Sequence, residues 1–219
     1  MRLLPLPGVF QPPSDSFMLA DQLRQERLGP GVKVLDLGTG SGHLAVVAAL
    51  TGASTVAVDV SRRALLSVRL NALLNGVRVT ALRGNLFAPV AGRRFDVIVS
   101  NPPYLPHPDG RLPRRGLARA IDAGPRGRAF LDRICAQAAD HLAPGGVLLL
   151  VHSSVCGERE TIEALEDRGL RAEVVFRHRG ALGPLLSARV DWLRAQGMLL
   201  PGDQEDVIVV RAIGSRAAG

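Results

Sequence analysis

Cysteine and long apolar runs are both scarce in this sequence. Only Cys135 and Cys156 are present, too few for the disulfide framework of a small secreted domain. Cys135 lies in a helix-like segment, where a plain buried thiol is expected. No window reaches the roughly 18 uninterrupted apolar residues that a membrane-spanning helix needs. Pro5 and Pro7 interrupt the N-terminus where a signal peptide needs an apolar helix. We therefore expect a cytoplasmic, reduced protein.

Lysine is almost absent as well. Lys33 is the only lysine among 27 basic residues, and the formal net charge is +7. Such a charge favours acidic partners, nucleic acid among them. A GC-rich genome would leave the same arginine skew through its codons, so a solvated basic surface is the plainer explanation. One cluster stands apart and could contact nucleic acid: Arg111, Arg114, Arg115 and Arg119.

Segments typical of strands and helices alternate along the chain. The strand candidates, read from runs of β-branched and other apolar residues, are Val32–Leu37, Thr55–Asp59, Val77–Leu82, Phe95–Ser100, Val147–Val151, Ala172–His178 and Asp206–Ala212. Helical patterns cover Gly42–Leu50, Ser61–Asn75, about Arg128 to Leu142, and Glu158–Arg168. Ser61 is a good N-cap, and Gly76 is a good left-handed terminator.

This alternation predicts an α/β fold, with a seven-stranded, mostly parallel, Rossmann-like sheet and helices on both faces. We expect one domain over residues 1–219, with a lead-in segment over 1–30 and an irregular or helical insertion over 179–205. The last strand follows that insertion and is expected to run antiparallel. Ligands of such sheets bind beyond the carboxyl ends of the strands.

A glycine-rich loop, DLGTGSG, follows the first predicted strand at residues 36–42. Its glycines let the backbone turn sharply and let a ligand approach the main chain, and the helix after it offers free N–H groups. A dinucleotide fingerprint would need glycine at His43. Asp36 would repel a pyrophosphate but could accept a hydrogen bond from an ammonium group, and Asp59 could hold ribose hydroxyls. These features favour a cationic nucleoside over NAD; a tight turn without a ligand is the alternative.

The fourth predicted strand ends in an unusual way. Val97-Ile98-Val99 is typical of a strand buried on both faces, and the chain then runs into NPPY, residues 101–104. Tyr104 is the only tyrosine. Each proline fixes its own φ and confines the preceding residue to extended geometry, so the segment is stiff. A simple β-turn is the alternative, but the position beside the expected glycine loop favours a site.

Taken in order, DLGTGSG, Asp59 and NPPY resemble the class I S-adenosylmethionine-dependent methyltransferases that modify amino groups. Within them they are most similar to the HemK family, which modifies glutamine in translation release factors. Gly8–Asp21, GVFQPPSDSFMLAD, is similar to the opening of the short, single-domain HemK2/Mtq2 branch. The likeness covers roughly Val9 to Val151 and the final strand. It implies the class I methyltransferase fold, S-adenosylmethionine as cofactor and a protein glutamine as acceptor. It also implies a small zinc-binding activator of the Trm112 type.

The resemblance assigns roles to the residues of these motifs. The Asn101 side-chain oxygen and the Pro102 carbonyl would accept hydrogen bonds from the acceptor NH2, which fixes a nitrogen whose lone pair is delocalised. The prolines would hold that carbonyl rigid, and Tyr104 would lie against the planar acceptor group. The expected catalytic residues are Asn101, Pro102, Pro103 and Tyr104. The residues expected to bind the cofactor are Ser16, Asp36, Gly38, Thr39, Gly40, Gly42, Asp59, Asn85, Leu86 and Asn101.

Other positions are less distinctive or depart from the family pattern. Ser16 matches a position near the cofactor, but it could instead be a helix N-cap. Asn85 replaces the usual aspartate beside the adenine, which its carbonyl could still bind, and Leu86 would provide the apolar contact. Residues 121–124 lack the tryptophan and paired glycines typical of the short branch, a departure that concerns the family's acceptor more than its cofactor. No histidine spacing is typical of a metal site, and we assign no metal.

Three further functions compete with methylation of a protein glutamine; one of them, N-methylation of a small molecule, has no positive sign in the sequence. The first is methylation of an exocyclic amine of adenine or guanine in RNA or DNA, which NPPY also serves and which the arginine cluster favours. The second is a catalytically silent module that only binds the cofactor. The intact NPPY segment argues against the silent module.

Overall fold

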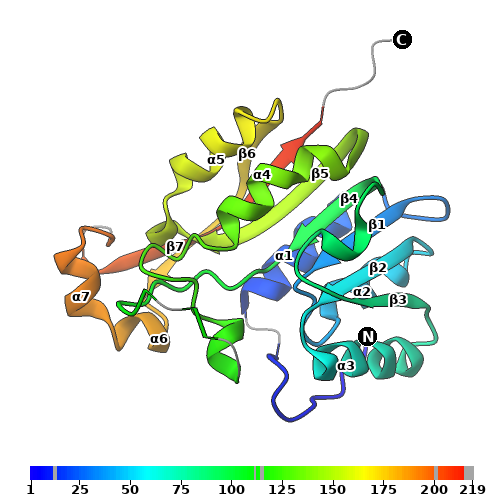
Figure 1. The fold of residues 1–219 in the computed structure, drawn as a ribbon, viewed down its shortest axis with the longest axis horizontal. Helices are drawn as coiled ribbons and strands as arrows, with labels where there is room; N and C mark the ends of the chain where they lie inside the picture. Colours follow the sequence, from blue (N-terminus) through cyan, green and yellow to red (C-terminus); the bar gives the residue numbers. More distant parts are fainter. Residues whose placement is uncertain (12–13, 111, 114–115, 200–201, 215–219) are drawn as a thin grey trace.

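One twisted sheet forms the centre of the molecule (Figure 1). The computed structural model describes residues 1–11, 14–110, 112–113, 116–199 and 202–214. The strands are β1 (Lys33–Leu37), β2 (Ser54–Asp59), β3 (Val79–Arg83), β4 (Phe95–Ser100), β5 (Leu142–Ser153), β6 (Arg171–Ala181) and β7 (Gln204–Ile213). Their order is β3-β2-β1-β4-β5-β7-β6. β1 to β5 pair in parallel, and β7 is antiparallel to both neighbours. The predicted seven-stranded, mostly parallel sheet and its antiparallel last strand are confirmed.

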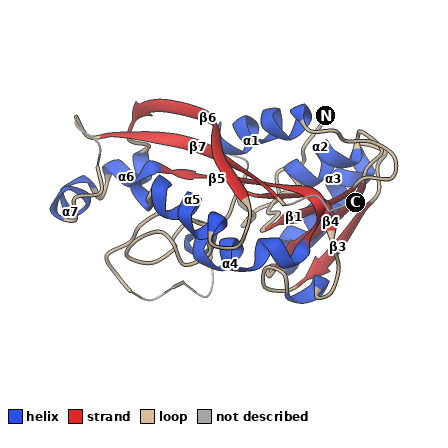
Figure 2. Ribbon diagram, turned by 90° about the horizontal axis from the view of Figure 1, so that it is seen from above, coloured by secondary structure: helices blue, strands red, loops and turns tan. Residues whose placement is uncertain are grey.

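Helices cover both faces of this sheet (Figure 2). They are α1 (Ser14–Gln25), α2 (His43–Ala49), α3 (Arg62–Leu74), α4 (Leu131–His141), α5 (Glu158–Glu166), α6 (Pro184–Ser187) and α7 (Val190–Ala195), with short 3-10 turns η1 (Ala88–Val90), η2 (Leu117–Ala120) and η3 (Ser154–Cys156). Alternate strand residues face opposite sides. Leu35 and Ile98 join the core that contains α4 residues, whereas Val34 and Val97 join the core that contains α1 and α2 residues.

The order of the strands determines where a site can form. From β1 the chain moves outward through β2 and β3, then crosses back to β4 on the other side of β1. Open α/β sheets bind ligands at such a switch point, beyond the carboxyl ends of the strands. Leu37 pairs with Ser100, so β1 and β4 end level with each other, and the Ser100 hydroxyl donates to the Leu37 carbonyl over 2.9 Å. The glycine loop and NPPY therefore begin side by side.

Helix boundaries follow local chemistry. The Ser61 hydroxyl caps α3 by accepting from the Ala64 amide, and Gly76 beyond the helix has φ +66°, as predicted. The helix expected from Arg128 begins later, at Leu131. Arg128 precedes it with a buried guanidinium that donates to the carbonyls of Cys156 and Gly157.

The predicted insertion over residues 179–205 needs correction at its ends. β6 continues to Ala181 and β7 begins at Gln204, so only the part between them holds α6 and α7. The ends stay in the sheet because Arg179 pairs with Asp206 across the two antiparallel strands at 2.8 Å. Ser16 is the third residue of α1 and therefore is not its N-cap, which removes that alternative.

Candidate active site at the switch point

Two cavities open at the carboxyl edge of the sheet. The glycine-loop cavity, about 400 Å³, is bordered by Gly38, Gly40, Asp59, Asn85 and Leu86. The tyrosine cavity, about 330 Å³, is bordered by Asp15, Tyr104, Leu186 and Glu205 among others. Asn101, Pro102 and Pro103 border both cavities and so form a shared wall.

The path of the glycine loop depends on backbone conformations that glycine adopts and other residues rarely do. Gly38, Gly40 and Gly42 have φ values of +69°, +54° and +85°, in the left-handed region. A Cβ at Gly42 would also lie 3.0 Å from Cα of Val68. Gly42 thus lets α2 and α3 approach each other, and it positions the loop without bordering the cavity.

Asp36 holds the glycine loop through hydrogen bonds. One carboxylate oxygen, Oδ2, accepts from the Thr39 hydroxyl at 2.6 Å and from the Ala45 amide at 3.0 Å. The other, Oδ1, is buried and has no hydrogen-bond partner among the described residues. Burial raises the pKa of Asp36 to about 7, and the charge of Asp59 adds to that rise. A buried acceptor without a partner favours a cation nearby.

Asp59 ends β2 and faces the glycine-loop cavity. Its two oxygens accept from the backbone amides of Gly40 at 3.1 Å and Ser61 at 2.8 Å, which fixes the carboxylate. Burial raises the pKa of Asp59, while the nearby positive charge of Arg119 opposes that rise. Arg119 also borders the cavity. Of the predicted basic cluster, Arg111, Arg114 and Arg115 lie outside the described residues.

Leu86 has an unusual backbone for its residue type. Its φ is +49°, in the left-handed region, and its side chain is 8% exposed on the cavity wall. A non-glycine residue there costs about 1–3 kcal/mol and is often found at a ligand site. Asn85 beside it is exposed. The pair thus offers one apolar and one polar group to a ligand.

The side chain of Asn101 is held by α1. Its Nδ2 donates to the Ser16 hydroxyl over 2.9 Å. The amide oxygen accepts no hydrogen bond from the described residues, so it remains available as an acceptor. Ser16, predicted to lie near the cofactor, borders neither cavity; its hydroxyl contacts Asn101.

The Tyr104 side chain is held by Asp15, the residue before Ser16 in α1. Its hydroxyl donates to the Asp15 carboxylate. Burial, with the adjacent Asp15 charge, raises the pKa of Tyr104 well above its usual value, so the phenol stays protonated. Asp15 was not among the predicted site residues, although PPSDS lay within the segment that resembles the short branch.

The far wall of the tyrosine cavity comes from the insertion, including Leu185 and Leu186 of α6. Arg189 fastens this wall to the segment after NPPY. It donates to the Pro106 carbonyl at 2.6 Å and to the buried Asp122 at 2.8 Å. These contacts join residues 83 and 67 positions apart, and no local pattern in the sequence predicts them.

The structure therefore brings most predicted residues to one place, but not all. Those that border a cavity are Gly38, Gly40, Asp59, Asn85, Leu86, Asn101, Pro102, Pro103 and Tyr104. The predicted residues that border neither cavity are Ser16, Asp36, Thr39 and Gly42. Within the described ranges, no three His, Cys, Asp or Glu side chains gather as a metal site would require, and no helix is long and apolar enough to cross a membrane.

Residues 1–113 match the family described as methyltransferase small domain. The chain belongs to this family. A protein of Methanocaldococcus jannaschii, provisionally named protein N5-glutamine methyltransferase, is 36% identical over 172 residues, which is 78% of this chain and 85% of that protein. The release factor glutamine methyltransferase of Gloeobacter violaceus is 40% identical over 150 residues, or 64% of this chain and 52% of that protein. The chain thus spans about half the length of this bacterial relative.

Solved methyltransferase structures agree with the fold. The Mtq2–Trm112 complex of E. cuniculi, described as responsible for methylation of the termination factor eRF1, matches with a TM-score of 0.65 and 25% identity, over 95% of this chain and 99% of that one. A methyltransferase from Pyrococcus furiosus matches with a TM-score of 0.63 at 18% identity, over 97% and 88% of the two chains, which concerns the fold alone. The predicted Rossmann-like methyltransferase fold and the resemblance to glutamine methyltransferases are confirmed.

Proposed function

We propose that this protein is an S-adenosylmethionine-dependent N-methyltransferase that modifies the side-chain amide of a glutamine, and that its substrate is a translation release factor. The observation that carries this proposal is the shared wall of Asn101, Pro102 and Pro103 between the two cavities. A donor in the glycine-loop cavity and a planar amide in the tyrosine cavity would meet there. The named activities of the relatives support the choice of acceptor. A release factor as substrate also implies a cytoplasmic enzyme.

The residues around the glycine-loop cavity fit the cofactor. Asp59 would hold the ribose hydroxyls, Leu86 would pack against the adenine, and Asn85 would bind the adenine amine. Asp36, with its free buried Oδ1, would favour the ammonium group from behind the loop. When bound, S-adenosylmethionine would supply an electrophilic methyl group on a positively charged sulfur. The amide nitrogen would take up that methyl group as the carbon–sulfur bond breaks, and one of its N–H protons would go to water.

The acceptor side contributes by position. The Asn101 oxygen and the Pro102 carbonyl would accept from the two amide hydrogens and so orient the nitrogen. The Ser16 hydroxyl accepts a hydrogen bond from Nδ2 of Asn101, which leaves the amide oxygen of Asn101 free to accept from the substrate. Tyr104, kept protonated, would present a neutral surface to the glutamine. Orientation of this kind can contribute about 7–11 kcal/mol to lowering a barrier.

Transfer of label tests this proposal. The purified protein is incubated with S-adenosylmethionine labelled in its methyl group and with a lysate, and the product is divided between protease and nuclease. Label lost only to protease supports the proposal, whereas label lost only to nuclease supports methylation of a base. If calorimetry detects cofactor uptake but nothing is labelled, the silent module is supported. Asn101→Ala is the control, and equal labelling by that variant would contradict the proposed role of NPPY.

A small activator of the Trm112 kind is a second part of the proposal, supported by the partner named for the E. cuniculi protein. β3 is at one end of the strand order, and its residues are only partly buried or exposed. Leu66 and Leu73 on the neighbouring α3 are 50% and 77% exposed. A strand edge beside apolar side chains suits pairing with a partner strand. Co-expression with the candidate activator should raise activity, and Leu73→Arg should reduce that gain.

A further inference from the structure

The N-terminal segment, residues 2–10, is fastened to α3 by two asparagine side chains. Asn75 accepts from the Arg2 amide at 2.8 Å and donates to the Arg2 carbonyl at 2.6 Å. Asn71 accepts from the Leu4 amide at 2.7 Å and donates to the Leu4 carbonyl at 3.5 Å. Each side chain thus meets both backbone groups of one residue, as a neighbouring strand would.

The spacing of the two asparagines suits this task. Four residues of helix rise about 6 Å, and two residues of extended chain rise about 6.6 Å. The distance between Asn75 and Asn71 along the helix therefore matches the distance between Arg2 and Leu4, to which they respectively bind. Figure 1 places the start of the chain against α3, in agreement with these contacts.

Asn71 also holds the glycine loop. Its Nδ2 donates to the Ser41 carbonyl at 2.9 Å, and the neighbouring Ser67 hydroxyl donates to the same carbonyl at 3.4 Å. Asn71 is fully buried. One side chain therefore links the N-terminal segment to the loop after β1.

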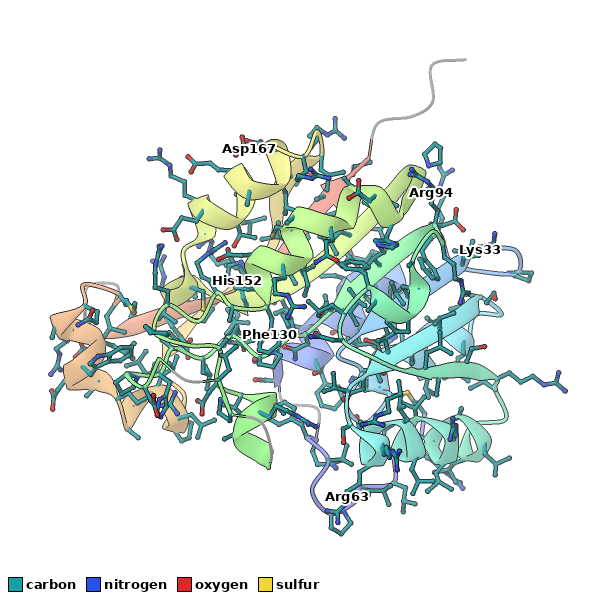
Figure 3. All side chains as sticks on the ribbon, in the orientation of Figure 1. Lys33, Arg63, Arg94, Phe130, His152 and Asp167 are labelled. Atoms are coloured by element: carbon teal, nitrogen blue, oxygen red, sulfur yellow. The ribbon has the colours of Figure 1, made fainter. Side chains whose placement is uncertain are left out.

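The far end of the N-terminal segment borders the glycine-loop cavity through Gly8, Val9 and Phe10. The Phe10 carbonyl lies so near the loop that a Cβ at Gly40 would be 3.5 Å from it. Gly8 has φ +75°, and a Cβ there would meet the guanidinium of Arg63, labelled in Figure 3 beside this segment. The segment and the glycine loop therefore face each other across the cavity mouth.

We propose that Asn71 and Asn75 are positioning residues that hold the N-terminal segment and the glycine loop as opposite walls of the cofactor cavity, so that they set cofactor affinity without touching the cofactor. This inference rests on the proposed function. If the wall is in place for only a fraction of the time, the apparent dissociation constant rises by the inverse of that fraction. The rate with saturating cofactor and acceptor should change little, because Asn101 keeps its place.

The test compares three variants by calorimetry with S-adenosylmethionine and by steady-state kinetics. They are Asn71→Ala, a chain lacking residues 2–5, and Arg69→Ala, an exposed change on the same helix. We expect the first two to raise Kd and the KM for the cofactor about tenfold, with kcat within about twofold, since a wall formed one-tenth of the time has that effect. The double variant should lose little more affinity than either single variant, because both changes remove the same linkage between the N-terminal segment and α3. Arg69→Ala should behave as wild type.

The truncation guards against simple unfolding of Asn71→Ala, since it leaves the helix and the sheet intact. If the truncated chain binds the cofactor as tightly as wild type, the inference is overturned. Equal losses in kcat and affinity for both variants would also overturn it, because they would indicate general damage. If the wild-type protein binds no S-adenosylmethionine, the proposed function fails and this inference fails with it, which is a distinct result.

Discussion

The two cavities that share the NPPY wall are built in opposite ways. The glycine-loop cavity draws mainly on loops that directly follow parallel strands, such as Gly38 after β1 and Asp59 at the end of β2. The tyrosine cavity gathers Asp15, Tyr104, Leu186 and Glu205 from segments spread over the whole chain. The walls of the first cavity that follow the strands are set by local backbone geometry, whereas its N-terminal wall and the whole tyrosine cavity depend on contacts between distant segments. Changes to each cavity should therefore affect different steps of the reaction.

The shared wall should show the largest effect. Asn101→Ala removes an acceptor for the amide hydrogens, and we expect kcat to fall by about 10²–10³, by analogy with loss of one oxyanion donor. Cofactor affinity, measured by calorimetry, should change only a few-fold because the glycine loop is untouched. A loss of affinity as large as the loss of rate would make Asn101 chiefly a cofactor residue and would weaken the distinction between the cavities.

A change on the glycine-loop side should act on the cofactor alone. Gly42→Ala forces a Cβ to within 3.0 Å of Val68 at a φ of +85°. We expect about 1–3 kcal/mol lower stability and weaker cofactor binding, with the KM for the protein acceptor unchanged. Val68→Ala removes only the 3.1 Å contact with Cγ2 and leaves the contact with Cα and the backbone strain, so it should restore only a small part of the loss. Thermal unfolding and calorimetry on the single and double variants measure both effects.

A change on the tyrosine side should do the reverse. Arg189→Gln removes the ion pair with the buried Asp122 and weakens the tie to the Pro106 carbonyl. The wall formed by α6 would loosen, and we expect the KM for the acceptor to rise about tenfold, in line with loss of a partly buried charged contact of about 1.5 kcal/mol. Cofactor affinity should stay at the wild-type value. A rise in cofactor Kd with no change in acceptor KM would contradict the assignment of the two sides.

The smallest effect concerns pH. The pKa of Asp36 near 7 means that the free protein holds a proton there below neutral pH. A cationic ligand favours the ionised carboxylate, so its binding should release about half a proton at pH 7 and tighten as the pH rises from 6 to 8. Calorimetry in two buffers of different ionisation enthalpy counts that proton, and Asp36→Asn should abolish the release. The folded state holds this proton up to a higher pH than the unfolded state does. The contribution of Asp36 to the free energy of unfolding is therefore fully present below pH about 4 and is lost as the pH rises through 7.

The contrast between the cavities also explains what the sequence could predict. The glycine loop, Asp59 and NPPY follow strands of recognisable pattern, and the strand order then brings them together. The contact between Ser16 and Asn101 joins residues 85 positions apart. The ties from Arg189 and from Asn71 are of the same kind. Such contacts depend on how helices lie against the sheet, which no local pattern encodes.

The extent of β6 and β7 was also missed for a physical reason. Arg177 and Arg179 look like surface residues in the sequence, yet both pair with the buried Asp206. That pairing extends the antiparallel strands into the predicted insertion.

Tandem mass spectrometry of a release factor treated with this protein and S-adenosylmethionine tests the central claim most directly. We predict one added methyl group, located on the side-chain nitrogen of a single glutamine and formed about 10²–10³ times more slowly when Asn101→Ala replaces the wild-type protein. A methyl group on another residue type, or on co-purified nucleic acid with none on the protein, would contradict the account.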